Sequence, residues 1–270
     1  MAIKIQQTSV APSSTSIAQA PNALGFTVLP FASELLKQSF ALRYQVYCEE
    51  LNFLNKQDYP SGEESDEFDA GSVHVGALNV NQEVIASARM VPSTRGLFPM
   101  ENHVAIDDSA TRENLKISLE ELRNSSAVEV SRLVVDPGYR RRRGDTRYAL
   151  APGHDRRNPE RAEAGRRSSP AGPTIALGIY KTLFQTSQLL GIRYWMAAME
   201  PVLISSLARY GMKFVPIGPV ADYYGPVQPC ALDVNTILAT MQASCPERGE
   251  DWAEAAPQLW NKLISSHTLH

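Results

Sequence analysis

The order in which strand-like and helix-like runs follow one another constrains the fold of this 270-residue chain more than any other feature. Short β-branched and apolar runs predict strands, and longer runs with apolar residues at helical spacing predict helices. The predicted strands are 26–29, 72–79, 83–91, 127–135, 194–199, 213–217 and 227–232, and the predicted helices are 34–51, 115–123, 174–190, 201–210 and 251–264. This alternation predicts a single α/β (α+β) domain in which helices flank a mixed β-sheet.

Three segments depart from the alternation. Residues 1–22 are rich in Ser, Thr, Ala, Gln and Pro, a composition typical of a disordered leader. Residues 144–173 are rich in Arg, Gly and Pro and have almost no apolar periodicity, which predicts a flexible Arg-rich insertion. Residues 236–270 are expected to form a C-terminal helical extension. The folded domain is therefore expected to cover residues 23–235.

The composition argues against several classes of protein. A hydrophobic content of 43% supports one substantial core, and a net charge of −3 argues against general binding to nucleic acid or to membrane surfaces. The cysteines form no CxxC pair and the histidines have no metal-ligand spacing, so no metal site is predicted. No GxGxxG or Walker pattern is present. Without a signal peptide or an apolar run of about 20 residues, we expect a cytoplasmic protein with no transmembrane segment.

Two opposite charges interrupt the predicted strand Ala127–Val135, at Glu129 and Arg132. Because an unpaired buried charge costs several kcal/mol, such charges persist where they are paired or functional. Strand geometry sends Glu129 and Ser131 to one face and Arg132 to the other. Either a β-bulge brings both charges to one site, or they have separate roles. A structural salt bridge at a sheet edge is the alternative interpretation.

Two further groups of charges stand close to apolar runs. Arg43 falls on the apolar stripe of the first predicted helix, where an inward-facing guanidinium needs a carboxylate partner. Alternatively, its stem lies along the protein and its head reaches solvent. Asp66 and Asp69 are spaced so that a turn points both carboxylates the same way, towards Arg43, Arg132 or a substrate ammonium. A solvated acidic loop is the alternative for this pair.

A basic tract follows the charged strand. It comprises Arg140, Arg141, Arg142 and Arg143. Such a tract is expected to steer an acidic partner through a salt-sensitive field. The alternative is a basic loop that only keeps the chain soluble. Binding of nucleic acid is disfavoured, because the tract has few interleaved aromatic residues and the chain as a whole is acidic.

Short motifs containing these residues follow one another along the chain. They are Leu42–Leu51, Glu64–Asp69, Arg89, Phe98-Pro99, Glu129–Leu133, Met199–Leu203, and Ile217–Pro219 followed by Tyr223–Gly225. The segments around Arg43, Asp66–Asp69, Arg89, Phe98-Pro99 and Glu129–Arg132 resemble, in order and rough spacing, the acyl-homoserine-lactone synthases of the GNAT acyltransferase superfamily. With Met199–Leu203, Ile217–Pro219 and Tyr223–Gly225 added, the chain looks closer still to a sister group, the N-acyl amino acid synthases associated with PEP-CTERM/exosortase systems. The resemblance covers residues 25–235 and implies a GNAT-like fold.

The resemblance implies transfer of a fatty acyl chain to an amino group. The donor would be the acyl-phosphopantetheine thioester of acyl carrier protein, the acceptor an amino acid or amine, and no cofactor would be tightly bound. The catalytic residues would be Glu129, Arg132, Arg43, Asp66 and Asp69, the substrate-binding residues Ser131, Leu133, Val134, Phe98 and Arg89, and the carrier-docking residues Arg140–Arg143. Our hypothesis is that Glu129 accepts the amine proton, that Asp66 or Asp69 holds the ammonium, and that Arg43 fixes those carboxylates.

One departure bears on the donor. Acetyl-CoA-dependent GNAT enzymes follow this strand with an (Arg/Gln)-x-x-Gly-x-(Gly/Ala) loop that binds pyrophosphate. Here residues 137–144 run into the predicted insertion instead, which favours a carrier-protein donor over coenzyme A. Two other functions stay open. One is a homoserine-lactone synthase that uses S-adenosylmethionine, and the other is a non-catalytic GNAT-like module that binds acyl carrier protein.

Overall fold

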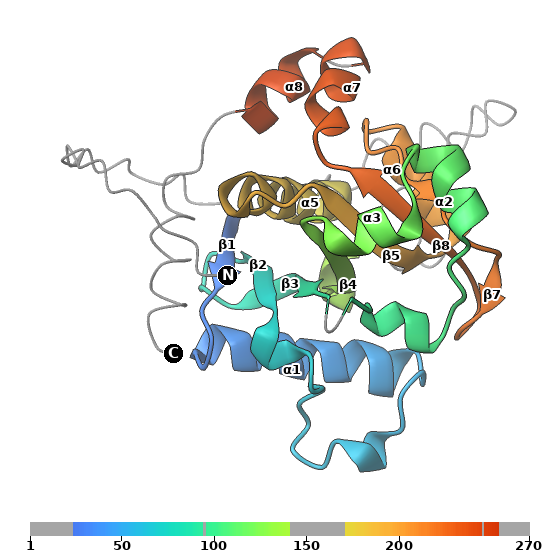
Figure 1. The fold of residues 1–270 in the computed structure, drawn as a ribbon. Helices are drawn as coiled ribbons and strands as arrows, with labels where there is room; N and C mark the ends of the chain where they lie inside the picture. The colour runs from blue at the N-terminus through green and yellow to red at the C-terminus, as the bar shows by residue number, and fades with distance from the viewer. Residues whose placement is uncertain (1–23, 94–95, 141–170, 245, 254–270) are drawn as a thin grey trace, which may run out of the picture.

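A mixed eight-stranded sheet forms the centre of the molecule (Figure 1). The computed structural model describes residues 24–93, 96–140, 171–244 and 246–253. The strands are β1 Gly25–Leu29, β2 Val73–Leu78, β3 Val84–Pro92, β4 Ala127–Val135, β5 Tyr194–Met199, β6 Val215–Pro216, β7 Ala221–Asp222 and β8 Pro226–Asp233. Their order is β1-β2-β3-β4-β5-β8-β6, and β7 pairs with β8. All pairs are antiparallel except β4 with β5.

Helices cover both faces of this sheet. They are α1 Glu34–Tyr44, α2 Asp108–Leu115, α3 Leu119–Asn124, α5 Ala171–Leu190, α6 Pro201–Ala208, α7 Thr236–Ser244 and α8 Pro246–Ala253. Helix α5 lies on one face and α1 on the other (Figure 1). The core on the α5 face contains Ile179, Val130 and Trp195, whereas Leu36 and Val134 belong to the core on the α1 face. None of the helices in the described ranges is long and apolar enough to cross a membrane.

Strand β4 contains a bulge, which is one of the two arrangements that its charge pattern allowed. Ser87 and Arg89 of β3 stand opposite Val134 and Ser131 of β4, so two residues of β4 oppose a single residue of β3. Arg132 lies in the bulge with a φ of 55°, a left-handed conformation that costs a non-glycine residue roughly 1–2 kcal/mol. Backbone strain of this kind persists where the surrounding structure enforces it, often at functional sites.

The bulge reverses the alternation of β4 side chains between the two faces. Val130 and Val135 are an odd number of positions apart, yet both pack into the core under α5. Val134 packs against α1. Glu129, Ser131 and Arg132 therefore share the α1 side of the sheet, as the bulge hypothesis predicted. A regular strand would have separated the two charges.

The sheet splits between its two parallel strands. The register pairs only 127–129 of β4 with 194–196 of β5, although β5 stays paired with β8 as far as Met199. Beyond Glu129, the side of β4 that faces β5 has no partner in this register. A gap therefore opens in the middle of the sheet, beside the bulge.

Most of the predicted strands and helices are confirmed, with differences at their ends. The first helix continues past α1 as a π-helical turn, Gln45–Glu50, and the strand predicted at 213–217 shortens to β6. Helix α2 was not predicted, because its sequence contains few apolar residues, and its start is fixed by Asp107, whose side chain accepts a hydrogen bond from the Ala110 N–H.

Two predicted segments are only partly covered by the described residues. The Arg-rich insertion was predicted to extend to residue 173, but α5 already begins at Ala171. The prediction was wrong there because Pro173 was taken as loop, whereas proline is tolerated in the first turn of a helix. The predicted leader 1–22, residues 144–170 and most of the predicted helix 251–264 lie outside the described residues.

Candidate active site

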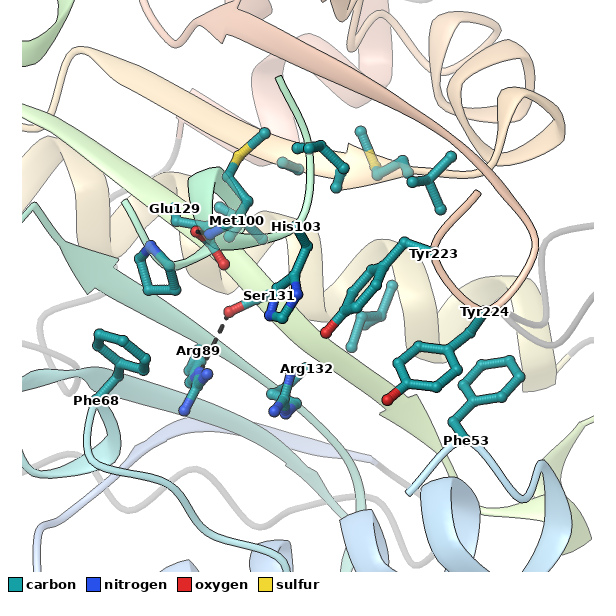
Figure 2. Close-up of a pocket in the computed structure, with 18 of the residues that line it drawn as sticks. Phe53, Phe68, Arg89, Met100, His103, Glu129, Ser131, Arg132, Tyr223 and Tyr224 are labelled. Carbon is teal, nitrogen blue, oxygen red and sulfur yellow. Dashed lines mark hydrogen bonds between the residues drawn. The ribbon is translucent and has the colours of Figure 1, made fainter. Parts of the chain in front are cut away.

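A cavity of about 530 Å³ occupies the split between β4 and β5 (Figure 2). Its polar lining includes Asp66, Arg89, His103, Glu129, Ser131, Arg132 and Tyr223. Its apolar lining includes Val130, Leu133, Tyr180, Ala197, Met199, Leu203, Phe214 and Val227. Tyr180 comes from α5 and Arg132 from the α1 side of the sheet, so the cavity passes through the sheet from one face to the other.

Arg43 forms the innermost part of a charged network beneath α1. Its side chain is only 1% exposed. The guanidinium donates two hydrogen bonds to the Asp69 carboxylate, at 2.7 and 3.1 Å, and its Nε donates to Glu64. Arg43 therefore points inward and is paired, and the alternative of a head in solvent is wrong. The fork of the guanidinium matches the carboxylate, which a lysine cannot reproduce.

Arg89 of β3 joins this network to the cavity. It donates to both oxygens of Asp66, at 2.6 and 2.8 Å, and to Asp69 at 2.6 Å. Its Nε donates to the Ser131 hydroxyl at 3.2 Å, the contact drawn in Figure 2. Asp66 and Asp69 thus converge on one guanidinium and do not form a solvated acidic loop.

Arg132 closes the network at the cavity wall. It donates to Glu64 and to Asp66, each at 3.2 Å, and its guanidinium lies 5.7 Å from the centre of the Tyr47 ring. Three arginines thereby face three carboxylates, so the cluster is neutral as a whole. A buried cluster of charges is tolerated when each member has such partners.

The charges of this network control the protonation of its acids. Burial alone raises the pKa of the Asp69 carboxyl, but its hydrogen bonds and charge contacts with Arg43 and Arg89 outweigh burial and hold that pKa well below the usual range. The pKa of Asp66 is lowered in the same way, against burial, chiefly by Arg89. Both acids are therefore carboxylates at neutral pH.

Glu129 differs from these carboxylates, because its pKa is raised. Its side chain is 5% exposed, and burial is the main cause of the shift. The Met100 N–H, which donates to Glu129 Oε2 at 2.6 Å, opposes the shift, as do the charges of Arg89 and Arg132. A buried carboxyl with a raised pKa that lines a cavity has the properties of a general base.

A row of aromatic rings borders the cavity opposite this acid. Phe53 stacks on Tyr224 and His103 stacks on Tyr223, with ring centres 5.0 and 4.3 Å apart, and the two tyrosines are 4.7 Å apart (Figure 2). The rings come from three segments far apart in the sequence. They form a continuous aromatic border of the cavity.

The structure divides the predicted site residues into two groups. Asp66, Arg89, Glu129, Ser131, Arg132 and Leu133 line the cavity, whereas Arg43, Asp69, Val134 and Phe98 do not. Arg43 and Asp69 lie behind the cavity wall, where Asp69 accepts hydrogen bonds from both Arg43 and the wall residue Arg89. Val134 and Phe98 belong to the core.

The basic tract is described only in part. Arg140 donates to both carboxylate oxygens of Glu50, at 2.8 and 2.6 Å, and to the Val135 carbonyl at 2.7 Å. Arg141–Arg143 lie outside the described residues. The docking role of this tract stays a prediction.

Several residues of the site were not singled out from the sequence. Glu64 is fully buried between Arg43 and Arg132, and Tyr47 lies under Arg132 on the π-helical turn. Both fall in motifs that the sequence analysis quoted, and a carboxylate two positions before Asp66 is the signal that was available for Glu64. His103 and Met100 had no such signal. In the described part of the chain no group of His, Cys, Asp and Glu is arranged to hold a metal ion.

Comparison with known proteins agrees with this architecture. Residues 42–149 match the family model described as an acetyltransferase (GNAT) domain. The structure superposes on the CoA-dependent acyl-homoserine lactone synthase BjaI, solved with SAM and isopentyl-CoA, with a TM-score of 0.57 at 16% identity, over 90% of this chain and 100% of that chain. The chain has a GNAT acyltransferase fold. The predicted fold class is confirmed.

Two further solved structures share this GNAT fold. TofI, in a ternary complex with an inhibitor and MTA, superposes with a TM-score of 0.53 at 17% identity, over 82% of this chain and 99% of that chain. FeeM, an N-acyl amino acid synthase from uncultured soil microbes, superposes with a TM-score of 0.52 at 13% identity, over 83% of this chain and 97% of that chain. No curated protein matches the sequence significantly.

We expect the protein to lose stability in acid through Asp66, Asp69 and His74. His74 is a buried residue of β2, and its Nε2 lies 3.0 Å from the Asp69 carbonyl oxygen. Burial lowers the pKa of His74, so the unfolded chain binds a proton below pH 6.5 that the folded chain resists. His74 should therefore lower the free energy of unfolding below about pH 6.5, and Asp66 and Asp69 should lower it further below pH 3.8 as they approach their lowered pKa values. Glu129, whose pKa is raised, acts in the opposite direction as the pH falls towards 4.5. Urea unfolding of the wild type and of His74→Gln between pH 8 and 3 measures both phases. An identical pH slope for the two proteins between pH 6.5 and 5 would contradict the role of His74.

Proposed function

We propose that this chain is an N-acyltransferase that moves a fatty acyl group from the thioester of acyl carrier protein to the amino group of an amino acid. The product is an N-acyl amino acid, as in the synthases associated with PEP-CTERM/exosortase systems. One observation carries the proposal. A buried carboxyl with a raised pKa, Glu129, stands at the sheet split, between a charged end and an apolar end of one cavity.

The two ends of the cavity suit the two halves of such a reaction. An acyl-phosphopantetheine is long and ends in an apolar acyl chain, and it fits a channel that passes through the sheet between β4 and β5. The acceptor carries an ammonium and a carboxylate, which suit Asp66 and Arg132 at the charged end. Asp66 lines the cavity and Asp69 does not, so of the two predicted ammonium ligands we assign the role to Asp66.

The chemistry needs no covalent enzyme intermediate. Glu129 takes one proton from the bound ammonium, directly or through a water molecule, and the amine nitrogen then attacks the thioester carbonyl carbon. Backbone N–H groups of β4 beyond Glu129, on the side that faces β5, stabilise the negative charge that develops on the oxygen. The C–S bond then breaks, the amide forms, and the pantetheine sulfur leaves as a thiol after it takes up the second proton that the nitrogen loses.

The identity of the donor rests on the segment after β4. In the sequence, residues 137–144 depart from the (Arg/Gln)-x-x-Gly-x-(Gly/Ala) pattern, and the described part of this segment holds a 3₁₀ turn, Pro137–Tyr139, followed by Arg140. This favours an acidic carrier protein, which the Arg140–Arg143 tract would attract. BjaI is described as CoA-dependent, so acyl-CoA is the competing donor.

The decisive experiment incubates the purified protein with acyl carrier protein thioesters or acyl-CoA and each candidate acceptor. Mass spectrometry reads the product, and a thiol reagent reads the freed pantetheine. The proposal predicts an N-acylated amino acid and faster thiol release from the carrier protein than from coenzyme A. If the product with S-adenosylmethionine were a lactone, the protein would be a homoserine-lactone synthase and the proposed function would be wrong. If no acceptor gave an acylated product or released thiol, the enzymatic function would be wrong.

A further inference from the structure

We propose that the 3₁₀ turn Pro99–Asn102 is a positioning device for Glu129, held in place by two residues outside the cavity, Glu101 and Arg123. The inference rests on the proposed function, because it assigns to these residues the task of preparing Glu129 as a base. Neither is among the cavity residues, and both would act only through the turn.

Glu101 fixes the turn at its start and ties it to a neighbouring helix. One carboxylate oxygen accepts a hydrogen bond from the Phe98 N–H at 3.0 Å, which closes the turn on itself. The other oxygen forms an ion pair with Arg123 of α3. Phe98 and Leu122 are also buried in the same core cluster, so the turn and α3 are packed together as well as paired.

The turn presents a backbone donor to the catalytic carboxyl. The first N–H groups of a helical turn have no acceptor within the turn. Here the Met100 N–H donates to Glu129 Oε2 at 2.6 Å. This contact holds one oxygen of Glu129 against the turn and fixes the plane of the carboxylate, while the side chain as a whole lines the cavity. In Figure 2 Met100 lies directly beside Glu129.

The same contact sets how readily Glu129 loses its proton. A hydrogen bond to the charged form of an acid favours that form, and so it opposes the effect of burial. The other groups that act on Glu129 are Arg89 from β3, Ser131 and Arg132 from β4, and Tyr223 from the segment before β8. Arg89, Ser131 and Arg132 are held by β3, β4 and the charged network, whereas Tyr223 stacks on His103, which directly follows the turn. Loosening the turn therefore removes the Met100 contribution and leaves those of Arg89, Ser131 and Arg132.

The test compares Glu101→Ala and Arg123→Met with the conservative variants Glu101→Gln and Arg123→Lys. Glutamine keeps an oxygen for the Phe98 N–H, and lysine keeps the positive charge. The readout is the carboxyl ¹³C titration of Glu129, assigned by its loss in Glu129→Gln, together with the pH profile of kcat/KM. Arg112→Met serves as the matched control, because it removes an exposed ion pair with Asp108 from the neighbouring α2.

The proposal predicts that Glu101→Ala and Arg123→Met raise the midpoint of the Glu129 titration by about half a pH unit or more, a threefold or larger loss of the deprotonated form in acid. The acid limb of kcat/KM should move by the same amount, and transfer at high pH should approach that of the wild type. The conservative variants should recover at least part of the shift, and Arg112→Met should leave it unchanged.

Two results would overturn the positioning role. One is an unchanged Glu129 titration in folded Glu101→Ala and Arg123→Met proteins. The other is a loss of transfer by the same factor at every pH, which is the signature of a purely structural contact. If the titration shifts but the wild type acylates no acceptor, the positioning geometry stands and the proposed function fails. The carboxyl titration therefore separates the two ideas.

Discussion

Replacing Glu129 with glutamine is expected to reduce the rate of acyl transfer by about 10²–10⁴-fold, the usual contribution of a positioned general base. Glutamine has nearly the same shape, and its amide oxygen can still accept the Met100 N–H. The fold should therefore survive, and substrate binding should change less than kcat. Thiol release from an acyl carrier protein thioester, measured across pH, checks both expectations.

The pH dependence sharpens this prediction. Because burial raises the pKa of Glu129, the acid limb of kcat/KM in the wild type should lie above the ordinary glutamate value of 4.5. In Glu129→Gln that limb should disappear along with most of the rate. Glu120→Gln, which changes an exposed glutamate of α3, is the matched control and should keep both rate and limb. Full transfer by Glu129→Gln with the wild-type pH profile would show that another group accepts the proton.

Replacing Arg43 with methionine is expected to lower the free energy of unfolding by about 3–5 kcal/mol, the typical effect of removing one partner from a buried ion pair. The change removes the guanidinium that holds Glu64 and Asp69 and leaves both carboxylates buried with fewer donors. Arg89 and Arg132 remain in contact with them, so the loss concerns one of three positive charges. Urea unfolding followed by circular dichroism measures the change.

Two comparisons give that measurement its meaning. Arg43→Lys keeps the charge but loses the fork that meets Asp69, so it should recover only part of the stability. Lys56→Met removes an exposed pair with Glu49, about half exposed on both sides, and should change stability by no more than about 0.5 kcal/mol. An Arg43→Met protein as stable as the wild type would mean that the ion pairs of Arg43 with Glu64 and Asp69 contribute no net stability.

The bulge in β4 is a structural feature that the local sequence pattern indicated as one possibility. Two charges at positions of opposite parity, inside a run that is otherwise apolar, require either separate roles or an inserted residue. The structure has the inserted residue at Arg132, whose φ of 55° records the strain. The alternation of side chains along a strand is a property of adjacent residues, so the sequence reduced the question to these two alternatives, and the structure decided for the bulge.

Other parts of the site were beyond such reasoning. In the sequence Glu64 cannot be distinguished from the other acids of its acidic loop. In the structure it is fully buried and paired with Arg43 and Arg132. His103 stacks on Tyr223, and no periodicity relates two rings more than a hundred residues apart. Val134 and Phe98 were predicted to bind substrate, but both lie in the core. Their positions in sequence motifs do not reveal which side chains line the cavity.

The sequence by itself indicated most of the order of strands and helices, the candidates for inward-facing charges and the choice in β4 between a bulge and separate roles, because each follows from short-range spacing. Only the tertiary structure decided which arginine meets which carboxylate, and where the sheet opens. The split depends on β4 and β5 parting after Glu129, and the cavity on side chains from α5 and from the segment around Tyr223. These contacts join residues distant in the chain, and packing of the whole domain sets their distances.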